Sequence, residues 1–288
     1  MRGICYHGFD ISRDESRAGD EATWGGGWVR EPGAADRSAI VTGGVEGLGR
    51  AVAEALLSVG YAVTVTHRAS GDRAKEFAHA AKAQGRRLLA LAADASEAKD
   101  VERSVDAHLQ AFGAPWALVH AAGPFLAPRR DLVDTPAEAL QSIVDGNLGS
   151  ALRYAQAVLP PMRRAGGGRV ILFGFDQAGQ LPAWPGRAVY AAAKSGVVSL
   201  AHTLAAEEAP HRITVNTICP GDIRDPLKEG TIAQARDGGG VAAPVGRSGS
   251  GEDIARVVRF LLETDADFLT GNTVYVTGGL DVLQRRRA

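Results

Sequence analysis

Short apolar segments recur along the chain from residue 38 onward, and longer stretches with a helical period separate them. Seven such segments are rich in β-branched residues and are predicted to be strands: 38–42, 61–66, 87–92, 116–121, 169–174, 213–218 and 273–277. Between them, stretches such as LGRAVAEALLSVG and VERSVDAHLQAFG repeat apolar residues every three or four positions, which predicts helices. Gly60, Gly85 and Gly113 end three of these stretches, where helix C-caps are expected. The pattern therefore predicts a repeated strand–helix unit.

Strands that alternate with helices favour a parallel sheet, because parallel neighbours need a crossover connection. The predicted strands are apolar throughout, which is typical of strands buried on both faces. The sequence thus predicts an α/β protein, a single-domain Rossmann doubly wound fold with a seven-stranded parallel sheet flanked by helices. We expect this domain to span residues 37–288. Residues 1–36 mix charges with glycine and show no periodicity, so we expect a flexible N-terminal extension there.

Composition excludes several classes of partner. The 288 residues carry 32 Lys and Arg against 33 Asp and Glu, so no global field draws in nucleic acid or an anionic membrane. No apolar run reaches the roughly 20 residues that a membrane helix needs. Cys5 and Cys219 are far apart and the histidines are scattered, so we expect neither a disulfide framework nor a metal site. A reduced, cytoplasmic, metal-free protein is the expectation.

A glycine-rich segment, TGGVEGLGR (42–50), follows the first predicted strand and opens a helix. In a βαβ unit such glycines permit a tight turn and a close approach of the backbone to a pyrophosphate, which the helix N-terminus stabilises. At the end of the second strand His67 and Arg68 stand where an NAD-binding carboxylate is usual, and an arginine there suits a 2′-phosphate. The sequence favours NADP(H); NAD(H) stays possible because Glu46 in the turn would repel that phosphate.

Tyr190 and Lys194 are four residues apart in a predicted helix, so both lie on one face of it. A phenol has a pKa near ~10 and is a poor acid at neutral pH unless its anion is stabilised, which a neighbouring ammonium does. The pair therefore predicts acid–base chemistry after the fifth strand. No serine or threonine lies between Ser150 and Ser195, although a second donor to the developing oxyanion would speed the reduction of a carbonyl.

Together these motifs resemble the short-chain dehydrogenase/reductase family from Ser38 to Gly279. TGGVEGLG resembles its cofactor turn, HAAG (120–123) its NNAG motif, and NTICPGDI (216–223) its segment beside the nicotinamide. The C-terminal stretch PVGRSGSGEDIARVVRFLL resembles that of the 3-oxoacyl-[acyl-carrier-protein] reductases. The resemblance implies an NADP-dependent oxidoreductase acting on CH–OH and C=O groups of a small-molecule or carrier-linked carbonyl substrate. It also implies a homotetramer or homodimer.

The resemblance further implies roles for single residues. Hydride passes from the nicotinamide to a carbonyl carbon while Tyr190 donates a proton, Lys194 lowers the pKa of Tyr190, and Asn147 helps to hold a water linked to Lys194. The expected catalytic residues are Tyr190, Lys194, Asn147 and Asp176. The expected cofactor-binding residues are Gly43, Val45, Gly47, Leu48, His67, Arg68, Asp94, Ala95, Ala121, Ala122, Gly123, Tyr190, Lys194, Pro220, Gly221 and Ile223.

The serine of the family has no counterpart here, since its position falls on Phe175 or Asp176. Phenylalanine cannot donate a hydrogen bond, whereas Asp176 can if burial keeps it protonated. An aspartate there, together with THRAS (66–70), also resembles the pteridine reductase branch, so a pteridine or dihydropteridine reductase is an alternative. A catalytically weak NADP-binding sensor or scaffold is another, although the presence of Tyr190, Lys194 and Asn147 argues against it.

Two further departures concern the surroundings of the site. In HAAG, His120 and Ala121 replace two asparagines, and we expect the loss of side-chain hydrogen bonds that brace neighbouring strands; His120 itself is interpreted as a structural histidine. Asp225 replaces a threonine after the Pro-Gly pair. Residues 224–250 combine a short helical pattern with a glycine run, which predicts a mobile lid over the substrate.

Overall fold

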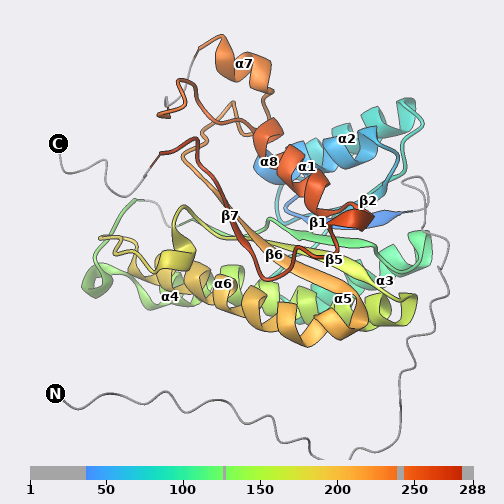
Figure 1. Ribbon diagram of the computed structural model, residues 1–288, viewed down its shortest axis with the longest axis horizontal. Helices are drawn as coiled ribbons and strands as arrows, with labels where there is room; N and C mark the ends of the chain where they lie inside the picture. The colour runs from blue at the N-terminus through green and yellow to red at the C-terminus, as the bar shows by residue number, and fades with distance from the viewer. Residues whose placement is uncertain (1–36, 126–127, 239–242, 281–288) are drawn as a thin grey trace, which may run out of the picture. The chain divides into compact units, whose positions relative to one another are not determined.

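The computed structural model describes residues 37–125, 128–238 and 243–280, so the predicted N-terminal extension and Cys5 lie outside the described residues. Seven parallel strands form one sheet in the order β3-β2-β1-β4-β5-β6-β7 (Figure 1). The predicted doubly wound fold is confirmed, with strand bounds within two residues of those expected. The strands are β1 (Ser38–Thr42), β2 (Ala62–His67), β3 (Leu88–Ala92), β4 (Ala117–His120), β5 (Gly168–Phe173), β6 (Ile213–Pro220) and β7 (Thr273–Val276).

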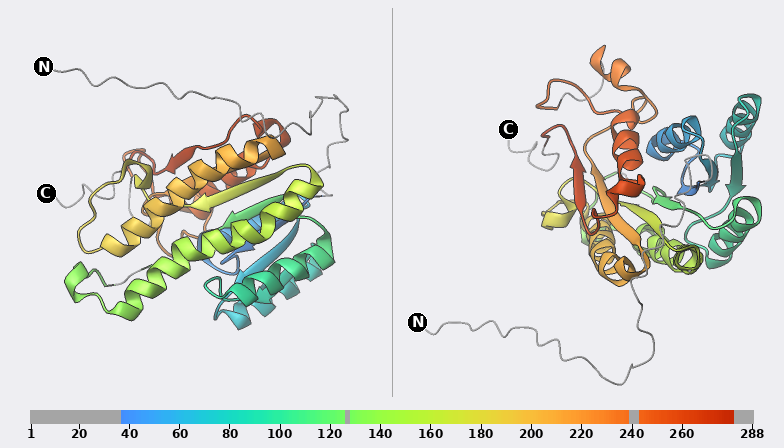
Figure 2. Two further views of the ribbon diagram at one scale, coloured as in Figure 1. Left: turned by 90° about the horizontal axis from the view of Figure 1, so that it is seen from below. Right: turned by 45° about the vertical axis from the view of Figure 1, so that its right-hand side comes forward.

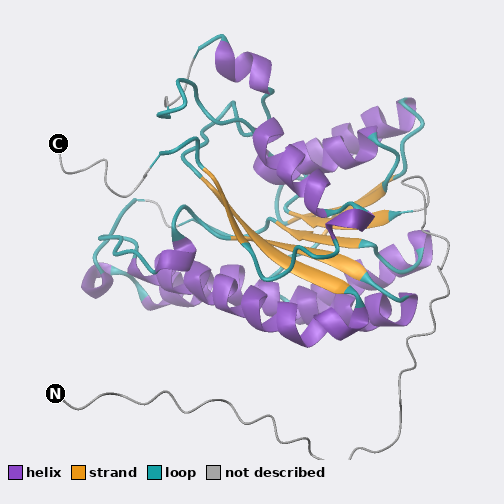
Figure 3. Ribbon diagram, viewed as in Figure 1, coloured by secondary structure: helices purple, strands orange, loops and turns teal. Residues whose placement is uncertain are grey.

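Helices cover both faces of the sheet (Figure 3). They are α1 (Gly47–Ser58), α2 (Gly71–Ala83), α3 (Ala98–Phe112), α4 (Ala137–Val144), α5 (Ser150–Ala165), α6 (Ala188–Glu208), α7 (Ile232–Arg236) and α8 (Gly251–Leu261). Successive residues of a strand point to opposite faces. Accordingly, Val41 of β1 packs with residues of α1, α2 and α8, whereas its neighbour Ile40 packs with residues of α3, α5 and α6. The left panel of Figure 2 looks onto the second face.

The strand order reverses beside β1, because β2 and β3 lie on one side of it and β4 on the other. Ligands of doubly wound sheets bind at the carboxyl ends of the strands at such a switch point. The register pairs Thr42, the last residue of β1, with His120, the last residue of β4. The glycine-rich turn and the HAAG segment therefore leave the sheet side by side. Within the described ranges, no helix is long and apolar enough to span a membrane.

His120 joins three elements by hydrogen bonds, which corrects the expected loss of bracing. Its Nδ1 lies 3.0 Å from Thr42 Oγ1 and its Nε2 lies 2.9 Å from Ser150 Oγ at the start of α5. Thr42 Oγ1 accepts from the Ala122 amide, and the Ser150 hydroxyl donates to the Gly146 carbonyl oxygen. Because the Ser150 hydroxyl hydrogen is used at Gly146, Ser150 must accept from Nε2, which therefore carries the imidazole proton. Nδ1 is then unprotonated and accepts the hydroxyl hydrogen of Thr42. Histidine thus replaces the asparagine bonds, and its interpretation as a structural residue is confirmed.

His108 of α3 is a second buried histidine that bridges strands, with Nε2 3.0 Å from Ser38 Oγ and Nδ1 2.8 Å from Thr64 Oγ1. Burial lowers the pKa of His108 to about 4. Burial and then the charge of Lys194 lower the pKa of His120 to about 3. Both imidazoles are therefore neutral in the folded protein throughout the physiological range.

We expect the free energy of unfolding to fall as the pH drops below about 6.5. Between that value and a pKa of about 3 to 4, the unfolded chain binds protons that the folded His108 and His120 refuse. Each histidine should lower the free energy of unfolding by about 2 kcal/mol at pH 5. His120→Asn cannot titrate and should lose about half of this pH dependence in urea denaturation at pH 7.5 and pH 5. The exposed His79→Asn is the matched control; equal pH dependence in both variants would contradict the prediction.

Candidate active site

The carboxyl ends of the strands surround one cavity of about 1680 Å³. All sixteen residues predicted to bind the cofactor line this cavity, and so do Phe175 and Asp176. Asn147 does not line it and lies behind Gly123, where a Cβ added to that glycine would come within 2.4 Å of Asn147 Oδ1. The structure thus brings the predicted residues together from segments spread between positions 43 and 223.

The glycine-rich turn has the shape needed for close contact with a phosphate. A Cβ at Gly49 would lie 2.3 Å from the Gly43 carbonyl oxygen, so no larger residue fits where α1 begins. Gly47 has φ +62°, a left-handed conformation that favours glycine. A Cβ added to Gly47 would have Lys228 Cδ as its nearest neighbour, at 3.8 Å. The turn therefore keeps side chains of its own away from the positive end of α1, although the Gly47 amide donates to Glu229 Oε1 at 2.7 Å. These residues fit a dinucleotide.

The far end of the cavity holds the residues expected at the adenosine. Arg68 is exposed at the end of β2, and Asp94 follows β3. Although burial alone would raise the pKa of Asp94, hydrogen bonds from the Ser96 hydroxyl (2.6 Å) and amide (2.9 Å) and the charge of Arg68 hold that pKa below its ordinary value. Asp94 is therefore an anion near Arg68 and is fixed in orientation by Ser96.

Tyr190 stands in the first turn of α6 among aromatic side chains. Its ring centroid lies 5.0 Å from that of Phe125, 5.9 Å from that of Trp184 and 6.1 Å from that of Phe175. Burial first, and then the negative charge available at Cys219, raise the pKa of Tyr190 to about 12 although Arg187 opposes this. Burial therefore dominates the pKa of Tyr190, and the lowering expected from Lys194 stays a prediction. The phenol is therefore protonated at neutral pH.

Lys194 lies one helical turn beyond Tyr190 and is 5% exposed. Its ammonium donates a 2.8 Å hydrogen bond to the carbonyl oxygen of Phe173, the last residue of β5. Burial lowers the pKa of Lys194 to about 8, a shift that the charge of Cys219 only partly offsets. At neutral pH the amine is still mostly charged. It is thus an ammonium fixed at the carboxyl end of β5, one turn from the phenol.

Asn147 lies in a single π-helical turn, Asp145–Gly149, between α4 and α5. Such turns interrupt α-helices and occur often at functional sites. The side-chain amide donates to the carbonyl oxygens of Ile143 (2.9 Å) and Pro124 (3.0 Å). Its Oδ1 is buried and finds no hydrogen-bond partner among the residues that the structure describes. A Cβ on Gly123 would approach both this oxygen and, at 3.4 Å, Lys194 Nζ, so Asn147 and Lys194 meet behind one glycine, as a shared water would require.

Phe175 and Asp176, the two candidates for the family's serine position, are both 5% exposed. Phe175 is the one whose ring contacts Tyr190 and Trp184, at 6.1 and 5.0 Å between centroids. Asp176 lies close enough to Cys219 that its charge, after burial and against Lys194, contributes to raising the pKa of that thiol to about 12. The ring of Phe175 therefore lies beside the phenol ring, and the carboxyl of Asp176 lies near Cys219.

The sequence analysis missed four residues that line the cavity in the neighbourhood of Tyr190: Phe125, Arg129, Trp184 and Arg187. The guanidinium of Arg187 lies 4.5 Å from the centre of the Phe125 ring, and that of Arg129 lies 5.9 Å from the centre of the Trp184 ring. Only the clustering of aromatic and basic residues in LPAWPGRAVY (181–190) hinted at this wall.

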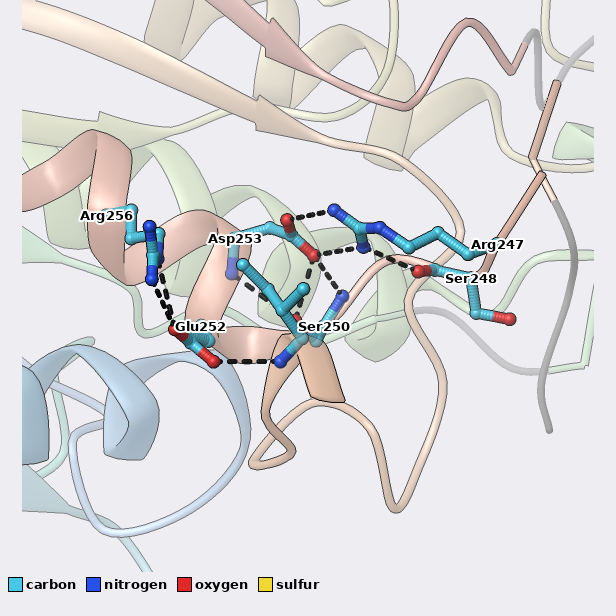
Figure 4. A network of polar contacts seen from close by, with 7 residues as sticks. Arg247, Ser248, Ser250, Glu252, Asp253 and Arg256 are labelled. Atoms are coloured by element: carbon cyan, nitrogen blue, oxygen red, sulfur yellow. Dashed lines mark hydrogen bonds and ion pairs between the residues drawn. The ribbon is translucent and has the colours of Figure 1, made fainter. Parts of the chain in front are cut away.

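The segment after β6 is tied to α8. Ser250 and Asp253 form a capping box at the start of α8, and Arg247 binds the Asp253 carboxylate through two nitrogens, at 2.8 and 2.6 Å (Figure 4). The Ile232 amide, at the start of α7, donates to Glu252. The glycine run of the predicted lid extends from Gly238 into 239–242, which lie outside the described residues. Motion of this lid therefore stays a prediction.

A doubly wound domain with a glycine turn and a Tyr/Lys pair at the carboxyl edge of its sheet defines an oxidoreductase of the Rossmann type. The chain belongs to the short-chain dehydrogenase/reductase family. A family model described as enoyl-(acyl carrier protein) reductase matches residues 43–281. Its relatives support the same assignment.

Two curated relatives and one solved structure show how far the similarity extends. The Bacillus subtilis protein named "Putative oxidoreductase YtkK" is 39% identical over 252 residues, 87% of this chain and 99% of its own. The 3-oxoacyl-[acyl-carrier-protein] reductase FabG of Staphylococcus epidermidis is 31% identical over 245 residues, 85% of this chain and 99% of its own. The structure of a "putative 3-oxoacyl-reductase" from Bacillus thuringiensis has a TM-score of 0.81 at 40% identity and covers 86% of this chain and 99% of its own.

Proposed function

We propose that this protein is an NADP(H)-dependent reductase that converts a carbonyl of a 3-oxoacyl thioester-like substrate to a hydroxyl. The observation that carries the proposal is that the sixteen expected cofactor residues, with Tyr190 and Lys194 among them, line one cavity. The similarity to a 3-oxoacyl-[acyl-carrier-protein] reductase supports the substrate class. A cytoplasmic homotetramer or homodimer remains a prediction.

The roles of the side chains follow from their places. Bound NADPH would supply the hydride. The amides of Gly47 and Leu48 at the start of α1 would hold its pyrophosphate, and Asp94 would contact its adenine. Tyr190, protonated because its pKa is about 12, would give its proton to the carbonyl oxygen. The Lys194 ammonium would stabilise the phenolate that remains, and Asp176 in its protonated form would offer a second hydrogen bond to the oxygen.

The preference for NADP(H) rests on Arg68 and on Arg73, which pairs with Glu46. Arg68 is exposed directly after β2 and lines the cavity, so we expect its guanidinium to contact a ribose phosphate. Glu46, which would repel that phosphate, has its carboxylate 3.5 Å from Arg73 Nη1. Because both partners are about half exposed, the pair offsets the charge of Glu46 only in part.

Absorbance at the NADPH band tests the proposal directly. With acetoacetyl thioesters, we expect NADPH to be oxidised, and NADH to be oxidised at least about tenfold more slowly at equal concentration, because Arg68 discriminates by a charged contact. Faster oxidation of NADH would contradict the cofactor preference. Tight binding of NADPH without turnover of any thioester, quinone or dihydropterin would favour the sensor or scaffold alternative.

A pteridine or dihydropteridine reductase is the second candidate, because flat rings surround the proton donor. Phe125, Phe175 and Trp184 present three aromatic walls around Tyr190, and such walls suit a planar heterocycle better than a flexible acyl chain. Asp176, buried beside them, could serve the proton relay that a ring C=N bond requires. In the same assay, a dihydropterin turned over faster than every thioester would select this candidate.

A further inference from the structure

A carboxylate from a distant part of the chain reaches the start of α1. Glu229, in the segment between β6 and α7, accepts a 2.7 Å hydrogen bond at Oε1 from the Gly47 amide. Arg73, in the first turn of α2, fixes the same carboxylate through Nη2, 2.7 Å from Oε1 and 2.8 Å from Oε2. The other Arg73 nitrogen, Nη1, faces Glu46. Three segments of the chain thus converge on the glycine-rich turn.

This contact satisfies a helix end that its own sequence leaves unsatisfied. The N-cap residue of α1, Glu46, makes no side-chain hydrogen bond to the helix, and the first turn contains no acidic residue. The amides at a helix N-terminus attract an anion. Glu229 supplies that anion from 182 residues further along the chain. The site where we place the pyrophosphate therefore already holds a negative group.

We propose that Glu229 is a built-in competitor of the cofactor phosphates, which must displace its carboxylate from the Gly47 amide before the dinucleotide is fully bound. The inference rests on the proposed function. A phosphate oxygen and a carboxylate oxygen cannot both accept from one amide at short range without strong repulsion. Glu229 therefore lowers the affinity for the cofactor.

The surroundings allow this exchange by a side-chain rotation. The backbone beside Glu229 is anchored, because the Gly251 amide at the start of α8 donates to the Leu227 carbonyl oxygen at 2.8 Å. A Cβ on Gly251 would lie 2.0 Å from the Lys228 carbonyl oxygen, which shows how closely this segment packs on α8. The Glu229 side chain, in contrast, is 33% exposed and can turn to solvent. The carboxylate can leave while the segment keeps its place.

The direction of the effect on binding tests the proposal. We expect Glu229→Gln and Glu229→Ala to lower the Kd for NADPH about threefold to tenfold, measured by titration calorimetry, because the competing charge is gone. Glu54→Gln is the matched control. It removes the same charge from α1, where Glu54 pairs with Arg50 at 2.7 Å and does not reach the turn, so its Kd should equal that of the wild type.

Any other change in the Kd of the Glu229 variants would overturn the proposal. A Kd that rises in both Glu229 variants would show that the carboxylate supports binding, and an unchanged Kd would show that it is not displaced; either result overturns the proposal. Hydrogen exchange gives an independent readout, since the Gly47 amide should exchange faster in unliganded Glu229→Ala than in the unliganded wild type. If the wild type binds neither NADPH nor NADH, the proposed function fails, whereas binding without a change in the variants rejects the competitor alone.

Discussion

Replacing Tyr190 by phenylalanine should lower kcat by about 10³-fold while the Kd for NADPH stays within about twofold. The phenol lies in the first turn of α6 and is protonated at neutral pH, because its pKa is about 12. Phenylalanine keeps the ring contacts with Phe125, Phe175 and Trp184 and removes only the hydroxyl. The loss should therefore appear in turnover measured with saturating substrate, and not in the binding of the dinucleotide.

Tyr275→Phe provides the matched control for this substitution. Tyr275 lies on β7, is 38% exposed and is not among the residues that line the cavity. Its variant should retain the wild-type kcat. Full activity in Tyr190→Phe would reject Tyr190 as the proton donor, and equal losses in the two variants would indicate a general effect of removing a hydroxyl.

Replacing Asp176 by alanine should lower kcat by about 10²-fold, whereas Asp176→Asn should stay within about tenfold of the wild type. A second donor to the developing oxyanion contributes about this much in other enzymes. An asparagine amide can donate in place of a carboxylic acid, and its shape is nearly the same. Alanine offers no donor. The measurement is kcat with the substrate that the wild type turns over fastest.

The two substitutions at Asp176 distinguish three roles. A fully active Asp176→Ala would mean that the residue is a bystander and that Tyr190 is the sole donor beside the hydrophobic Phe175. Equal losses in the alanine and asparagine variants would point instead to the negative charge of the carboxylate. Because Asp176 is 5% exposed, thermal unfolding of each variant should accompany the kinetics, so that a misfolded variant is not taken for an inactive one.

The sheet and the cofactor turn could be predicted from sequence because their signals are local. Apolar runs predicted the bounds of every strand to within two residues. The spacing of the glycines located the cofactor turn, in which position 49 has room only for glycine. The aromatic wall could not be predicted, since Phe125 and Trp184 lie in loops without periodicity and meet only in the folded chain. The contact between Glu229 and Gly47 joins residues 182 positions apart, and no local pattern reports such a pair.

The histidine at the end of β4 shows where a motif alone misleads. The HAAG segment predicted a loss of hydrogen bonds, because a motif does not show which side chains its histidine meets in the folded chain. In the folded chain His120 accepts from Thr42 and donates to Ser150, which lies 30 residues away. These two hydrogen bonds of the imidazole compensate for those of the missing asparagines. The burial that raises the pKa of Tyr190 could not be predicted either, because the spacing of Tyr190 and Lys194 does not show how deeply the phenol is buried.

The bridge through His120 also has a consequence for how this sequence can change. Thr42, His120 and Ser150 form a chain of hydrogen bonds that runs in one direction, because each hydroxyl accepts one bond and donates another. Changing His120 alone leaves Ser150 without its donor and Thr42 without its acceptor, so the effects of substitutions at the three positions should be strongly epistatic. A protein engineer who grafts the NNAG motif onto this scaffold should therefore replace the three residues as one unit.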